Sequence, residues 1–130
     1  MKSTLLVGIV GLALATTAPV SAHHSYGAYD QTRYVTIEGQ LERVVFANPH
    51  VVLFVNTTDN QTFEAEWASI NQLAKGGVTA TSLKVGDRVV ITGRPLQNAA
   101  EAKMSLLSEV RHVNDGWTWK RNAPPPTAGQ

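Results

Sequence analysis

The residues of this chain best suited to metal binding or proton transfer are its four histidines: His23, His24, His50 and His112. Imidazole nitrogens bind transition metals and exchange protons near neutral pH. His23 stands out because the segment before it reads as a cleavable secretory signal. Cleavage after Ala22 would make His23 the first residue of the mature protein.

The signal is indicated by three features in the expected order. Lys2 supplies a short positive region, Leu5–Ala15 an apolar stretch, and Val20–Ala22 the small residues that signal peptidase requires. The apolar stretch is too short for a comfortable membrane anchor. We therefore expect a periplasmic or secreted protein, cleaved after Ala22 and without a transmembrane anchor.

An N-terminal histidine can grip one metal ion through both its α-amino group and its imidazole. A third nitrogen, from His24 or His50, would complete a set that suits copper(II). The sequence thus predicts a metal site from His23, His24 and His50. The tight amino-terminal copper motif is excluded, because it needs histidine where Ser25 stands. A purely structural interpretation remains open. In it, His23 and His24 are a solvated terminus, His50 caps a strand or bonds the turn before it, and His112 is a hydrogen-bonded, partly buried histidine.

Two carboxylates and two tryptophans are further candidates. Glu64 and Glu66 lie on one face of an expected strand, where paired carboxylates can do acid–base work. Their alternation with apolar residues instead favours a solvated outer face. Trp117 and Trp119 share a strand parity and are candidate ligand-binding residues, since barrel faces often bind ligands by stacking. The competing interpretation makes both indoles part of the core.

Several classes of function are excluded by residue types. The chain has no cysteine, which rules out thiol catalysis and cysteine-bound zinc or clusters. The serines lack a matching His–Asp arrangement, and Gly76–Gly77 lacks the pattern of a phosphate loop. No catalytic residue is identified, so we do not predict an enzyme. Copper is the one cofactor that the sequence suggests.

The charge balance argues against nucleic acid as a partner. The chain carries 11 Lys+Arg and 10 Asp+Glu, and loss of Lys2 with the signal leaves the mature protein near neutral. A nucleic-acid binder would show a basic stripe. A small ligand or another envelope protein is the expected partner, with the oligomeric state open.

Hydrophobic periodicity predicts a mainly β domain. Residues 34–46 alternate with a period of two, and Gly39 falls on the buried parity, where glycine marks a bulge or bend. Ser69 and Gln72 match a capping box that opens one short helix, which Gly76–Gly77 ends. Further strands are expected at 50–56, 61–67, 88–93 and 104–113, the last with Met104, Leu106 and Val110 in phase.

This order predicts a five-stranded OB-like Greek-key barrel with one short helix between strands 3 and 4. The expected organisation is a signal peptide (1–22), an extended or loosely held N-terminal arm (23–33), the barrel domain (34–119) and a disordered proline-rich tail (120–130). Tyr26 and Tyr29 could pin the arm to the domain surface.

Short motifs in this order resemble a family of small exported bacterial proteins catalogued as a domain of unknown function. The motifs are His23-His24-Ser25, Asn48-Pro49-His50, Trp67, Gly86-Asp87 and Gly93-Arg94-Pro95. The resemblance runs from about His23 to Gly116 and implies an OB-like, periplasmic protein. It offers no catalytic residue to carry over. We therefore expect a small binding or accessory module, with copper binding through His23 as the alternative.

Overall fold

The computed structural model describes residues 26–122. The expected signal peptide, both His23 and His24, and the tail from residue 123 lie outside the described residues. The elements are η1 (Tyr26–Ala28), β1 (Val35–Val45), β2 (Val52–Thr57), β3 (Thr62–Glu66), α1 (Ile70–Lys75), β4 (Arg88–Pro95), β5 (Lys103–His112) and β6 (Thr118–Lys120). Within residues 26–122, no helix is long and apolar enough to cross a membrane.

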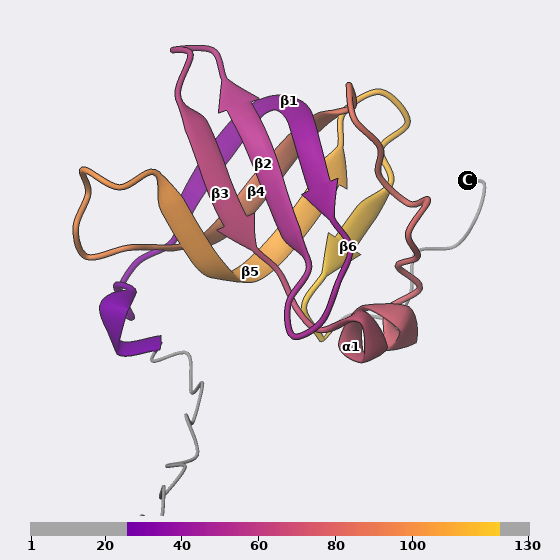
Figure 1. The fold of residues 1–130 in the computed structure, drawn as a ribbon, viewed down its shortest axis with the longest axis horizontal. Helices are drawn as coiled ribbons and strands as arrows, with labels where there is room; N and C mark the ends of the chain where they lie inside the picture. Colours follow the sequence, from indigo (N-terminus) through magenta and orange to yellow (C-terminus); the bar gives the residue numbers. More distant parts are fainter. Residues whose placement is uncertain (1–25, 123–130) are drawn as a thin grey trace, which may run out of the picture.

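The six strands form one sheet that closes on itself. Their order is β3-β2-β1-β4-β5-β6, and an additional parallel pairing joins β3 to β5. This pairing closes a five-stranded barrel, with β6 added beside β5 (Figure 1). The single short helix, α1, follows β3 and lies at one end of the barrel (Figure 1). The predicted OB-like architecture is confirmed.

Strand β1 serves two sides of the barrel, and Gly39, where the sequence predicted a bulge or bend, lies where the two sides meet. Its first half pairs with β4 and its second half with β2, and the two pairings overlap at Gly39 and Gln40. A Cβ added at Gly39 would lie 2.1 Å from the backbone oxygen of Asn56. A register irregularity follows between Leu41 and Arg43. Glycine is required here because two backbones approach closely where the strand bends.

The core lies inside the barrel and under α1. On β2 the alternation is strict: Leu53 and Val55 are fully buried, whereas Val52 and Phe54 are half-buried. The inner face of this strand is therefore fully covered, and its outer face is covered only in part. The outer face is covered in part by the Arg43 guanidinium, 3.6 Å from the centre of the Phe54 ring.

Helix α1 begins as the sequence predicted. The Ser69 side chain accepts a hydrogen bond from the Gln72 backbone N–H, and the Gln72 side chain accepts one from the Ser69 N–H. A second acceptor, Oδ1 of Asn48, takes the N–H of Ile70 at 3.1 Å. Leu73 fastens the helix to the core, where it is fully buried.

Strand β5 departs from the predicted phase. Met104 and Val110 are buried as expected, but Leu107 is buried in place of Leu106. Leu106 has a φ of 50°, and its region faces a register irregularity between Thr92 and Arg94 of β4. Between the pairs Thr92–Glu109 and Arg94–Ser105, β4 has one residue and β5 has three, so β5 carries two extra residues. This irregularity changes the parity of buried side chains locally, which buries Leu107, and the original parity is restored by Val110.

Candidate functional site

The N-terminal arm, residues 26–33, is fastened to the loop between β4 and β5. Tyr29 forms an isolated antiparallel bridge with Leu96. The Asp30 N–H donates to the Pro95 carbonyl at 2.8 Å, and the Gln97 N–H donates to the Ala28 carbonyl at 2.9 Å. Residues 26–33 of the expected arm are thus held against the barrel, because they complete backbone hydrogen bonds that the strand edge would otherwise leave to water.

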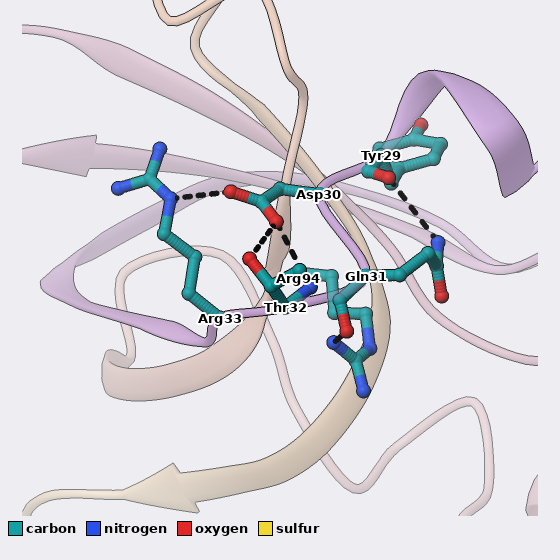
Figure 2. A network of polar contacts seen from close by, with 6 residues as sticks. All are labelled: Tyr29, Asp30, Gln31, Thr32, Arg33 and Arg94. Atoms are coloured by element: carbon teal, nitrogen blue, oxygen red, sulfur yellow. Dashed lines mark hydrogen bonds and ion pairs between the residues drawn. The ribbon is translucent and has the colours of Figure 1, made fainter.

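The turn that follows is organised by the Asp30 carboxylate (Figure 2). It accepts hydrogen bonds from the N–H of Thr32 at 2.9 Å, from the Thr32 hydroxyl at 2.6 Å and from Nε of Arg33 at 2.8 Å. These bonds, with the Thr32 hydroxyl first, lower the pKa of Asp30 to about 2. Arg94 of β4 donates to the Gln31 carbonyl, which ties the turn to the barrel.

Between arm and barrel lies a pocket of about 540 Å³. We call it the arm–barrel pocket. Burial, and then the nearby Glu66 carboxylate, raise the pKa of the Tyr29 phenol above its usual value. The lining residues are Ala28, Tyr29, Glu66, Leu96, Gln97, Asn98, Glu101 and Lys103.

Glu66 connects this pocket to His50. Nδ1 of His50 lies 3.3 Å from Oε1 of Glu66, and the Ser105 hydroxyl donates to the same oxygen at 3.2 Å. The side chains of His50 and Glu66 are 20% and 16% exposed, and Ser105 is buried. The Ser105 hydroxyl and the His50 imidazole thus contact the same carboxylate oxygen.

The register explains the contact between His50 and Glu66. Glu66 pairs with Val52 across the β2–β3 hairpin, and His50 lies two residues before Val52, on the same parity. Diagonal neighbours of this kind lie within reach of long side chains. The prediction of a solvated face is wrong for Glu66, whereas Glu64 is more exposed and lies 3.5 Å from Nζ of Lys103. Counting outward from the loop between the two strands pairs Val52 with Glu66, and this count could have brought His50 and Glu66 together from the sequence.

His112 lies apart from this site and is structural. Its Nδ1 lies 2.7 Å from Oδ1 of Asp115, and its Nε2 lies 3.5 Å from Oδ1 of Asp87, an ion-pair contact too long and poorly aligned for a hydrogen bond. The pKa of Asp115 is lowered first by the Trp117 N–H and then by His112. The histidine thereby holds the turn between β5 and β6, in agreement with the partly buried role expected for it.

The two tryptophans do not form an exposed platform. Trp119 is 8% exposed, and its ring meets that of Trp67 edge to face with centroids 5.1 Å apart. Trp117 is half-buried against the core. The structure thus agrees with the core interpretation that the sequence left open, although one edge of Trp119 lines a pocket of about 280 Å³ near Lys75 and Lys120.

A further pocket, of about 410 Å³, lies at the opposite hairpin end of the barrel. It is lined mainly by backbone and neutral polar groups, and its one charged side chain, Arg88, is bound to Glu38 at 2.8 Å. It holds no carboxylate–imidazole pair. The arm–barrel pocket is therefore the stronger candidate site.

The described part of the chain contains no group of three or more His, Cys, Asp or Glu residues able to hold a metal ion. Of the predicted metal ligands, His50 is held by Glu66, while His23 and His24 fall outside the described residues.

A family model described as a family of unknown function (DUF6152) matches residues 11–105. The matched range contains the arm, the arm–barrel pocket residues, His50, Glu66 and Ser105. No curated protein and no solved structure matches the chain.

Proposed function

The chain belongs to the DUF6152 family, and we propose that it is an exported binding or accessory module whose ligand site is the arm–barrel pocket. The observation that carries this proposal is the arm itself. Backbone hydrogen bonds at Ala28, Tyr29 and Asp30 fix it against the β4–β5 loop, and a polar pocket forms where the two meet. A wall assembled from distant segments is typical of binding sites.

The groups in the pocket suit binding better than catalysis. Glu66 and Glu101 offer carboxylates, Lys103 offers an ammonium group, and Gln97 and Asn98 offer amides. Such a mixture recognises a small polar ligand through several directed contacts. Ser105, beside the pocket, donates its hydroxyl hydrogen to Glu66.

Export is supported by the signal-like segment 1–22 and by its small residues Val20–Ala22. The expected location of the protein is the periplasm or the extracellular medium. Intact-mass measurement of protein recovered from the periplasm should give a chain that begins at His23. A chain that retains Met1 would refute export through this signal.

Binding is tested by native mass spectrometry of the exported protein after mild purification. We expect an additional bound mass on the wild type, reduced in Tyr29→Ala and in Gln97→Ala. The matched control is Asn60→Ala at the far hairpin, which should keep that mass. The same loss in the control, or no bound mass on any form, would contradict a ligand site at the arm.

Copper binding is a second candidate function. It is favoured by one specific observation, the contact between His50 and Glu66 beside this pocket.

A further inference from the structure

We propose that the protein has a second binding site, which takes the phosphate group of a small organic molecule. The site is the pocket of about 280 Å³ between the end of α1 and β6, which we call the α1–β6 pocket. It shares no lining residue with the arm–barrel pocket, and α1 lies away from η1 in Figure 1. The proposal therefore does not depend on the ligand proposed for the arm.

Positive charge gathers in the α1–β6 pocket. Lys75, Lys120 and Arg121 all line it, and the described residues that line it include no carboxylate. The whole chain carries 11 Lys+Arg against 10 Asp+Glu, so three cations around one pocket are a local excess. Oε2 of Glu109 lies 3.6 Å from Nζ of Lys120 and offsets one of them. Three cations less this carboxylate leave two positive charges for a ligand.

Arg121 is held in place by β5. Its backbone N–H donates to the Ser108 carbonyl at 2.9 Å, and its Nε donates to the Leu107 carbonyl, also at 2.9 Å. A guanidinium group carries five N–H donors in a rigid fork that matches the oxygens of a phosphate. Because Nε is already bound to the strand, the terminal nitrogens of Arg121 are oriented to bind the phosphate through paired hydrogen bonds.

The end of α1 completes the pocket without repelling an anion. The last carbonyls of a helix carry partial negative charge. Here the carbonyls of Leu73 and Ala74 accept hydrogen bonds from the N–H groups of Gly76 and Gly77, at 2.9 and 3.0 Å. Lys75 lies in the same last turn and adds a full positive charge to it.

The apolar part of the pocket selects an organic phosphate. Ala68 and one edge of Trp119 line it, and the helix end approaches the indole closely, since a Cβ added at Gly76 would lie 2.7 Å from Nε1 of Trp119. A phosphate ester carries a charge of about −1.5 to −2 at pH 7. It would match the two positive charges, whereas a carboxylate would match only one.

The test is an NMR titration of the isotope-labelled protein with phenyl phosphate at neutral pH. Benzoate and benzyl alcohol are the matched singly charged and neutral probes. Phenyl phosphate should shift the signals of the Trp119 indole N–H and the Gly76 amide, and inorganic phosphate should reverse these shifts by competition. Benzoate should bind at least about 3-fold more weakly, and benzyl alcohol should shift neither signal.

Three outcomes would overturn the proposal. The first is no shift of the Trp119 signal at any concentration of phenyl phosphate. The second is a set of shifts centred on Tyr29 and Gln97, which would place the anion in the arm–barrel pocket. The third is equal affinity for phenyl phosphate and benzoate, which would refute the assignment to phosphate.

Charge variants assign the site to its residues. Lys75→Gln and Arg121→Gln should each lower the affinity for phenyl phosphate by about 3- to 10-fold, because each removes one positive charge from the pocket. The matched control is Lys84→Gln, which removes an exposed lysine outside the pocket and should leave the affinity unchanged. Equal weakening in the control would mean that the protein responds only to net charge, and the site would fall.

Thermal unfolding without ligand checks that each variant is folded. Lys75 is exposed at the end of α1, so its variant keeps the test decisive even where loss of the Arg121 hydrogen bond destabilises β6. A folded Lys75→Gln protein that binds phenyl phosphate as tightly as the wild type would contradict the proposed site.

Discussion

The imidazole of His50 contacts the carboxylate of Glu66 across the open end of the β2–β3 hairpin, with Nδ1 and Oε1 3.3 Å apart. The contact follows from strand register, since Glu66 pairs with Val52 and His50 occupies the diagonal position. Burial of Ser105 beneath the carboxylate keeps that oxygen hydrogen-bonded. The barrel therefore holds the polar pair of His50 and Glu66 close to the N-terminal arm.

Leu53→Ala should lower the free energy of unfolding by about 2–5 kcal/mol, because Leu53 is fully buried in the barrel and its removal leaves a cavity. Chemical denaturation monitored by tryptophan fluorescence gives the value. The control is Val85→Ala, whose side chain is 66% exposed and should change stability by less than about 0.5 kcal/mol. A loss under about 0.5 kcal/mol at Leu53 would show that β2 is peripheral.

Gly39→Ala should destabilise the barrel by at least about 1–3 kcal/mol. The new methyl carbon would lie 2.1 Å from the backbone oxygen of Asn56 and 2.9 Å from Cγ1 of Val55, so β1 and β2 must separate. Gln40→Ala, at the exposed neighbouring position, is the matched comparison. If both variants unfold at the denaturant concentration of the wild type, the close approach of the two strands is not present in solution.

The Asp30 carboxyl should titrate with a pKa of about 2 instead of its usual 3.8, because it accepts hydrogen bonds from Thr32 and Arg33. A carboxyl whose folded pKa is depressed stabilises the fold above its unfolded pKa. That contribution to the arm should therefore be complete above about pH 4 and disappear as the pH falls through about 2. Carbon NMR of the carboxyl group measures the midpoint.

Thr32→Ala provides the control for this titration. It removes the largest cause of the shift, so the Asp30 pKa should rise toward 3.8. A wild-type midpoint already near 3.8, or no change in the variant, would mean that the turn in Figure 2 does not organise the arm.

Local signals were sufficient to predict the barrel. Alternation in β1, the glycine at its bend and the capping box at Ser69 are each decided by near neighbours in the sequence. The prediction that Leu106 is buried was wrong. The register between β4 and β5 is irregular at this point, and the alternation in the β5 sequence does not indicate it. Tertiary context selected Leu107 for the core.

The candidate site was harder to predict than the fold. His50 was recognised by its residue type, but Glu66 was assigned to a solvated face, since strand alternation says nothing about what covers that face. The arm lacked any hydrophobic period, and its order comes from hydrogen bonds to the β4–β5 loop, about 65 residues along the chain. Such long-range pairing of polar segments leaves no periodic pattern to read.

The most direct test of the ligand site at the arm is the bound mass on the exported protein, measured by native mass spectrometry in the wild type, in Tyr29→Ala and in the far-hairpin control Asn60→Ala. We predict that the bound mass is reduced in Tyr29→Ala, because Tyr29 lines the arm–barrel pocket, and is kept in Asn60→Ala. A bound mass that is equal in all three forms, or that is lost equally from both variants, would contradict a ligand site where the arm meets the barrel.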